Sequence, residues 1–262
     1  MTRMRFELAH ITRDEVAQYA PDSILVLPTA ATEQHGPHLP LGTDAMLGEA
    51  VAREALRVAE TASPLVLAPV MPFGSSHHHL IFSALSLSTD VYLASINDLL
   101  DTALQSGFRR IYVMNSHGGN VDCVRLAARD TALNNRSVIG TCSYWDVSMP
   151  ELESNGYADD WPVPGHAGQF ETSMMLAIRP ELVRLDQLPA DAHTAPRGAE
   201  VTQPGSVIHV HGDWARMDGF TDAPVEPTAE LGREFLRIAG ASVAKALEEF
   251  DTLSLRSMME AS

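Results

Sequence analysis

The chain has 262 residues, 45% of them apolar, and a formal net charge of −16. This length and apolar content favour a single domain spanning residues 1–262. The acidic balance and the lack of a basic patch argue against a nucleic-acid partner, and the lack of an apolar run of about 20 residues argues against a membrane span. Two cysteines make no disulfide scaffold and no apolar leader follows the N-terminus, so we expect a cytoplasmic protein with reduced thiols.

Strand and helix patterns alternate along the chain. Short apolar runs predict buried strands at 24–27, 65–70, 110–114 and 137–144. Amphipathic patterns with capping or breaking residues predict helices at 45–58, 91–105, 121–133, 170–178 and 228–247. The segment 181–226 is rich in Pro, Gly and Asp and is expected to be irregular. The alternation predicts an α/β fold with a mostly parallel sheet flanked by helices.

The loop after the first predicted strand concentrates carboxylates and imidazoles. Glu33 and His35 are two residues apart, so in an extended chain their side chains point the same way. Asp44 follows a Pro/Gly segment that can fold it back towards them, and its two oxygens could bridge two ions. Such a set suits Zn, Mn or Fe. The alternative is a polar loop in which Asp44 merely caps the next helix.

A second candidate ligand, His117, stands where the third predicted strand ends and a helix begins. Gly118 and Gly119 follow it and allow close approach of the backbone. A phosphate-binding nest and a plain helix-entry turn with an incidental histidine are the alternatives. The position of His117 at the strand exit favours a metal ligand.

Two more candidates lie at the start of the helix predicted at 170–178. Glu171 interrupts an apolar stretch, so its carboxylate either faces solvent or binds a cation. His166 precedes the helix in a glycine-containing turn and can act as an acid or base in a cleft.

Three consecutive histidines follow the second predicted strand. Consecutive rings point in different directions, so we expect only one, His79, to face a site. Ser76 could contact substrate. In a parallel sheet these segments all meet at the carboxyl edge, which predicts one shared site. The sequence lacks the Gly-x-Ser-x-Gly elbow of serine hydrolases, the dinucleotide-binding Gly-x-Gly-x-x-Gly and the P-loop.

Three blocks of this sequence, at 33–44, 115–120 and 166–173, resemble the signature blocks of the creatininase (creatinine amidohydrolase) family. The resemblance implies a compact α/β fold with a parallel sheet. It also implies a dinuclear divalent metal site, hydrolysis of a C–N amide bond, and assembly as a homo-oligomer, with a hexamer as one form.

Carried over by position, the resemblance places the metal ligands on Glu33, His35, Asp44 and His117, with Asp44 bridging. Creatininases proper continue the second block with Tyr and a ligating Glu. This chain has glycines at those two positions, so it resembles a Gly–Gly variant rather than a strict creatininase. Glu171 is the best candidate for the missing carboxylate.

The resemblance also implies roles around the substrate. His166 matches the acid/base histidine of the family, and Trp145 and Trp161 resemble tryptophans that flank the substrate. Together with Ser76, His79 and Gly118, these tryptophans form the predicted substrate site.

The expected activity is hydrolysis of a small or cyclic amide, not of a typical peptide bond. Two divalent ions per subunit, with zinc preferred over manganese and iron, would activate a hydroxide, and His166 would protonate the leaving nitrogen. The alternatives are a peptidase that trims a specific small peptide precursor and a formamide deformylase. A catalytically inactive, oligomeric metal-binding protein is the non-enzyme alternative.

Overall fold

The computed structural model describes residues 5–158, 163–188 and 208–260. Five strands form one sheet in the order β1-β3-β2-β4-β5, and every neighbouring pair is parallel. The strands are β1 (Arg5–Glu7), β2 (Ile24–Thr29), β3 (Leu65–Leu67), β4 (Arg110–Asn115) and β5 (Val138–Ser143). The predicted α/β fold with a parallel sheet is confirmed.

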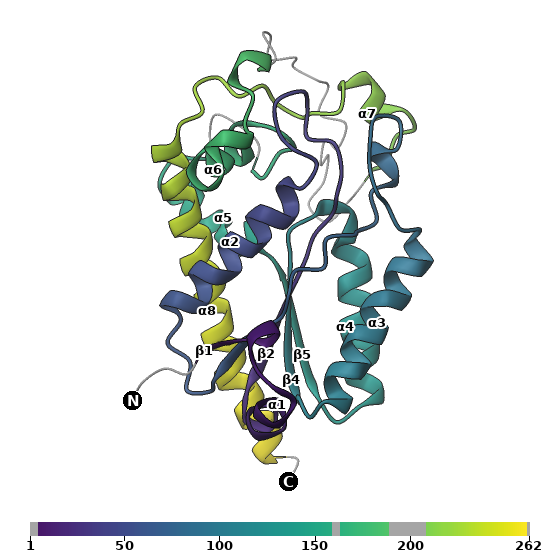
Figure 1. Ribbon diagram of the computed structural model, residues 1–262, viewed down its shortest axis with the longest axis vertical. Helices are drawn as coiled ribbons and strands as arrows, with labels where there is room; N and C mark the ends of the chain where they lie inside the picture. Colours follow the sequence, from purple (N-terminus) through teal and green to yellow (C-terminus); the bar gives the residue numbers. More distant parts are fainter. Residues whose placement is uncertain (1–4, 159–162, 189–207, 261–262) are drawn as a thin grey trace.

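Helices cover both faces of the sheet (Figure 1). One layer packs around the long C-terminal helix and contains α2 (Thr43–Val58), α5 (Tyr144–Ser154), α6 (Gln169–Ile178) and α8 (Ala229–Glu260). The other layer contains α3 (Thr89–Gln105) and α4 (Val121–Asn134). Two short α-helices lie outside these layers, α1 (Arg13–Tyr19) and α7 (Asp213–Arg216). The 3₁₀ turns are η1 (Leu8–His10), η2 (Ala20–Asp22), η3 (His77–His79), η4 (Gly118–Asn120), η5 (Pro180–Leu182) and η6 (Leu185–Gln187).

Two hydrophobic clusters, one on each face, hold the layers to the sheet. Every residue of β2 and β4 is buried, as expected for central strands of a sheet covered on both sides. Phe170 of α6 packs on Phe235 of α8 with ring centroids 4.8 Å apart, and Tyr92 and Ile96 anchor α3 on the opposite face.

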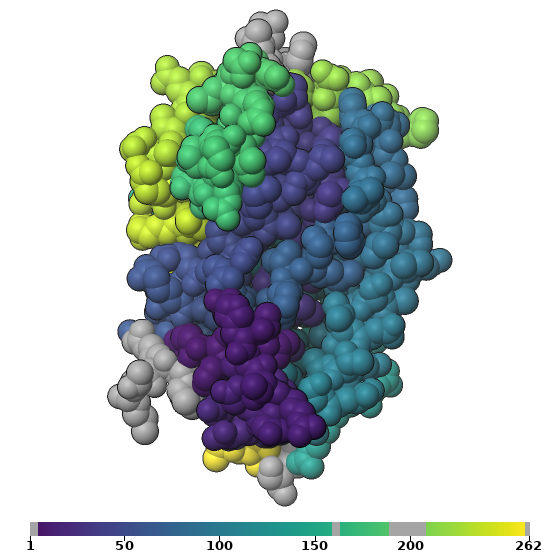
Figure 2. All heavy atoms as spheres, in the orientation of Figure 1, coloured from purple at the N-terminus to yellow at the C-terminus, as the bar shows by residue number. Residues whose placement is uncertain are grey.

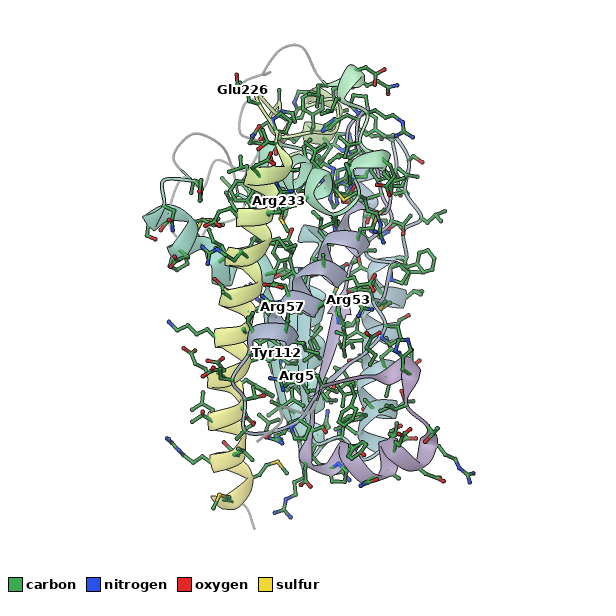
Figure 3. All side chains as sticks on the ribbon, turned by 60° about the vertical axis from the view of Figure 1, so that its left-hand side comes forward. Arg5, Arg53, Arg57, Tyr112, Glu226 and Arg233 are labelled. Carbon is green, nitrogen blue, oxygen red and sulfur yellow. The ribbon has the colours of Figure 1, made fainter. Side chains whose placement is uncertain are left out.

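Some element boundaries differ from the sequence prediction. Tyr144 begins α5 instead of ending a strand, β3 stops at Leu67, and α8 runs on to Glu260. The edge strand β1 was not predicted, because three half-buried residues, two of them charged, carry no apolar run. Arg5 of this strand donates to the carbonyl of Leu56 at 2.7 Å, which fastens the edge strand to the end of α2 (Figure 3).

The carboxyl ends of the strands and the loops that follow them gather at one end of the molecule. There the segment 208–226, which carries α7, closes beside the loop that follows β2 (Figure 2). A hydrogen bond from Gln34 to the carbonyl of Gly219 joins the two segments. Among the described helices, none combines the length and apolar character of a transmembrane span.

Candidate metal centre

The structure brings all five predicted metal ligands together at the carboxyl edge of the sheet. Glu33 and His35 come from the loop after β2, Asp44 from the first turn of α2, His117 from the end of β4, and Glu171 from the first turn of α6. Each is 5% exposed or less. Segments more than 130 residues apart along the chain therefore supply one buried polar cluster.

Asp44 lies between two imidazoles. Its Oδ1 is 3.1 Å from Nε2 of His35, and its Oδ2 is 3.2 Å from Nδ1 of His117. Glu33 Oε1 is also 3.2 Å from Nδ1 of His117, and Glu171 Oε1 is 3.8 Å from Nε2 of His35. Ligand atoms about 2.0–2.2 Å from a tetrahedral ion are roughly 3.3 Å from one another, so these separations suit two ligand sets that share Asp44.

The two imidazoles are held in complementary tautomers by backbone carbonyls. His35 donates from Nδ1 to the carbonyl of Glu33 at 3.1 Å, and His117 donates from Nε2 to the carbonyl of Ser75 at 3.2 Å. In each ring the other nitrogen faces the carboxylates. Metal-binding histidines commonly use such outer hydrogen bonds, which fix the ring and leave a lone pair for the ion.

The charge balance of the cluster calls for a cation. Three carboxylates are buried there, whereas the only buried Lys or Arg side chain in the described parts of the chain, Arg110, pairs with Asp251 at 2.9 Å. Both carboxylate oxygens of Glu33 and Oδ2 of Asp44 lack a hydrogen-bond partner among the described residues. Buried carboxylates without donors are costly, so the donor set fits divalent ions.

The pKa shifts reflect the same balance. Burial alone would lower the pKa of His117, but Glu33 and Asp44 outweigh it and raise that pKa to about 10. For His35, burial is outweighed by Asp44 and Glu171, which raise its pKa well above the usual value. Without metal, these two imidazoles would be the counter-ions of the carboxylates, and divalent ions would have to replace their protons.

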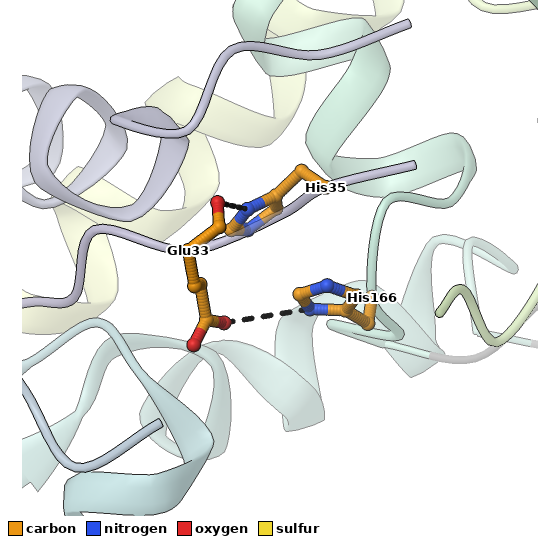
Figure 4. Close-up of side chains that lie close together, drawn as sticks. All are labelled: Glu33, His35 and His166. Carbon is orange, nitrogen blue, oxygen red and sulfur yellow. Dashed lines mark hydrogen bonds and ion pairs between the residues drawn. The ribbon is translucent and has the colours of Figure 1, made fainter. Parts of the chain in front are cut away.

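The predicted acid/base residue, His166, lies beside the cluster. Its Nε2 donates to the carbonyl of Gln34 at 2.9 Å. Its Nδ1 is 3.8 Å from Oε1 of Glu33 (Figure 4). Burial, together with His35 and His79, lowers its pKa well below the usual value. The ring is therefore neutral and presents a lone pair towards the carboxylates.

The turn after His166 orients Glu171. Ala167 has a φ of +56°, a left-handed conformation that non-glycine residues rarely adopt. In this conformation its N–H donates to Oε2 of Glu171 at 2.6 Å, which leaves Oε1 facing His35. Local backbone strain next to a site is often part of how the site is built.

The predicted substrate residues are placed differently from one another. His79 is buried, with Nε2 3.4 Å from Oε1 of Glu33, and the Oγ of Ser76 is 3.3 Å from Nε2 of His117. Gly118 is exposed, with open space where a side chain would stand. These three lie at the cluster or beside it, and their contact with substrate stays a prediction.

The predicted tryptophans give less support to a substrate site. Trp145 is packed into the core edge-on against Tyr144, with ring centroids 5.3 Å apart. Trp161 lies outside the described residues. Their roles beside the substrate stay predictions.

Three residues at the site were missed from the sequence. Trp214 packs against His79 with ring centroids 4.4 Å apart and against His166 at 5.3 Å. His78, expected to be solvated, stacks parallel to His117 at 5.6 Å and belongs to a possible ligand group with it and Glu33.

Gln34 contacts both His79 and His166. Gln34 stands between two predicted ligands, a position that could have drawn attention to it, whereas no local signal marks Trp214.

Gly119 explains why a carboxylate at that position is absent. A Cβ at Gly119 would lie 2.1 Å from the carbonyl oxygen of Ser75 and 2.6 Å from Nε2 of His117. The same carbonyl accepts the hydrogen bond that orients His117. Any side chain at this position would therefore disturb His117, a predicted ligand, whereas Glu171 brings a carboxylate to the cluster from α6.

The chain matches the creatininase (creatinine amidohydrolase) family over residues 9–247. It is 33% identical over 186 residues to a creatinine amidohydrolase of Pseudomonas putida, covering 64% of this chain and 69% of the relative. It is 31% identical over 178 residues to a mycofactocin precursor peptide peptidase of Mycobacterium ulcerans, covering 63% and 62%. A solved structure described as the manganese form of a creatininase superposes with a TM-score of 0.75 at 26% identity, covering 93% of this chain and 97% of that one.

The fold and the buried carboxylate–imidazole cluster define a metal-dependent amidohydrolase, an enzyme that cleaves C–N bonds. The chain belongs to the creatininase family. The resemblance identified from the three sequence blocks is thereby confirmed.

Proposed function

We propose that this enzyme hydrolyses the C–N bond of a small or cyclic amide at two divalent metal ions, with His166 as general acid/base. One ion would be held by Glu33, His117 and one oxygen of Asp44. The second would be held by His35, Glu171 and the other oxygen of Asp44. The observation that carries the proposal is the placing of the two Asp44 oxygens against two different imidazoles, at 3.1 and 3.2 Å.

When bound, two divalent ions would acidify a water molecule and polarise the amide carbonyl. The side chains of this chain do the rest. The carboxylates of Glu33, Asp44 and Glu171 compensate the charge of the ions. His166, neutral and with Nδ1 facing the cluster, can accept a proton from the attacking water and return it to the leaving nitrogen.

A small substrate is favoured by the burial of the cluster. Glu33, His35 and His79 are fully buried, and the indole of Trp214 covers the rings of His79 and His166. Burial of this kind favours a compact substrate over an extended chain. A formamide is also compact, because its acyl group is a single carbon. Deformylase activity is therefore kept as a variant of the proposed reaction.

A peptidase that trims a small peptide precursor is the second candidate. The open space at Gly118 favours it, since a bulky residue there would narrow the approach to His117. The 31% identity to a mycofactocin precursor peptide peptidase supports the same reading.

We further propose zinc as the native metal. Imidazole and carboxylate ligands also suit manganese and iron, so these two metals are the alternatives. A cytoplasmic location is part of the proposal and accords with two free cysteines. A homo-oligomer, with a hexamer as the form suggested by the family, is supported by a run of exposed apolar side chains after η3, namely Leu80, Ile81, Phe82 and Leu85.

Substitution of His166 tests the mechanism. We expect His166→Ala to retain the metal content of the wild type but to lower kcat by roughly 10²–10⁴-fold, the usual contribution of a general acid/base. Zinc-loaded enzyme would be assayed against a panel of linear amides, cyclic amides, formamides and short peptides. His10→Ala is the matched control, because the His10 side chain is 71% exposed on η1.

Loss of metal together with activity in His166→Ala would make this histidine a ligand instead. If the zinc-loaded wild type hydrolyses peptides but none of the small amides, the peptidase replaces the small-amide reading.

A further inference from the structure

The side chain of Gln34 has a fixed orientation. Its Oε1 accepts from the backbone N–H of Gly36 at 2.9 Å, and its Nε2 donates to the carbonyl of Gly219 at 2.5 Å. A backbone N–H can only donate and a carbonyl can only accept. These two partners therefore determine which end of the amide carries the nitrogen.

Nε2 of Gln34 has one further hydrogen, and two imidazole nitrogens lie within reach of it. Nδ1 of His79 is 2.8 Å away and Nε2 of His166 is 3.0 Å away. Nε2 of His166 already donates to the backbone carbonyl of Gln34, so it carries a proton and cannot accept another. The remaining hydrogen of Gln34 therefore goes to Nδ1 of His79.

The consequence is an N–H aimed at the cluster. An imidazole nitrogen that accepts a hydrogen bond carries no proton, so the ring of His79 is not the doubly protonated cation. A neutral imidazole that accepts at Nδ1 has its proton on Nε2. That Nε2 is 3.4 Å from Oε1 of Glu33 and has no hydrogen-bond partner among the described residues. His35, His117 and His166, in contrast, donate from the ring nitrogen that faces away from the carboxylates, each to a backbone carbonyl.

We propose that Gln34 is a positioning residue that makes His79 an N–H donor, not a metal ligand, at the metal centre. The inference rests on the proposed function, because it assigns a role within the same site. The Nε2–H would hold the carboxylate of Glu33, or a substrate oxygen that gains negative charge during attack. A pre-oriented donor of this kind stabilises such charge in many hydrolases.

Gly219 supports this role independently. Its φ is +79°, and a Cβ there would lie 2.8 Å from Oε1 and 2.9 Å from Nε2 of Gln34. Only glycine combines that backbone conformation with such close approach to the amide. The 208–226 segment, which also carries Trp214, is thus fitted to the side chain that orients His79.

Nitrogen-15 NMR of zinc-loaded, full-length protein tests the assignment directly. Long-range correlations between ring protons and ring nitrogens distinguish a proton on Nδ1 from one on Nε2, and His79→Asn identifies the signal. We expect His79 to be neutral with its proton on Nε2. A proton on Nδ1, or zinc bound to either ring nitrogen, would overturn the proposal.

Gln34→Glu provides the second readout. A carboxylate of the same shape accepts where the amide donated, so His79 is expected to move its proton to Nδ1, and kcat is expected to fall roughly 10–100-fold with zinc content unchanged. Gln18→Glu, the same change on an exposed position of α1, is the control. An unchanged His79 tautomer in folded Gln34→Glu would contradict the proposal.

The NMR result also separates this inference from the proposed function. If no amide is hydrolysed but His79 carries its proton on Nε2, the positioning role stands and the assigned reaction fails. If amides are hydrolysed but the tautomer is reversed, the reaction stands and the positioning role fails.

Discussion

The two adjacent glycines, Gly118 and Gly119, differ in the room around them. A Cβ at Gly118 meets nothing within 4 Å, whereas one at Gly119 meets the carbonyl of Ser75 at 2.1 Å and the ring of His117 at 2.6 Å. Neither has a positive φ, so the contrast is one of packing and not of backbone conformation. Substituting each glycine by alanine therefore separates the effect of crowding His117 from the effect of merely adding a methyl group.

We expect Gly119→Ala to displace His117 and to lower zinc affinity at least 10-fold, since orienting contacts of a ligand are typically worth 10–100-fold. Gly118→Ala is the matched control and should bind zinc as the wild type does. Zinc affinity would be measured by competition with a chromogenic chelator. Equal affinities for the two variants would mean that Ser75 and His117 do not constrain this turn.

At the scale of residues, sequence spacing predicted which ligands converge but not how they are oriented. Glu33 and His35 could be paired because their separation of two places them on one side of an extended chain. The tautomers of His35 and His117 depend on carbonyls reached only in the folded chain. Trp214 meets His79 across more than 130 residues, and no local pattern encodes such a contact.

At the scale of elements, the amphipathic pattern of the C-terminal helix did not predict where that helix ends. The amphipathic pattern predicted a helix ending at 247, but α8 continues to Glu260. The extension places Asp251 at the amino end of β4, where it pairs with buried Arg110 at 2.9 Å and accepts from the N–H of Ala62 at 2.7 Å. A long-range ion pair and the buried ring of Phe250 thus fasten this additional length to the rest of the fold.

Breaking that pair should be costly. Asp251→Ala leaves the Arg110 guanidinium buried without its carboxylate, so we expect a loss of about 3–5 kcal/mol in the free energy of unfolding. Asp146→Ala is the control, because its partner Arg125 is 3.8 Å away and both side chains are more than half exposed. That control should lose less than about 1 kcal/mol. Urea unfolding of both variants measures these losses. An equally small loss in the free energy of unfolding of both would contradict the assigned role of Asp251.

At the scale of the whole molecule, strand–helix alternation was sufficient to predict a parallel sheet with its site at the carboxyl edge. The buried apolar runs of β2 and β4 carry that signal strongly. The edge strand β1 and helix α1 carried too little of it, although Thr12 and Glu15 form a capping box that the sequence already contained. The position of the 208–226 segment beside the cluster depends on tertiary contacts such as that of Gln34 with Gly219.

The central claim is a dinuclear site whose second ion depends on Glu171. Elemental analysis of the zinc-loaded protein, repeated on Glu171→Ala, measures this most directly. Glu181→Ala, an exposed position just after α6, is the control. We expect about two ions per subunit in the wild type and in the control, and about one in Glu171→Ala. At most one ion in the wild type, unaffected by Glu171→Ala, would contradict both the dinuclear site and the placing of Glu171 in it.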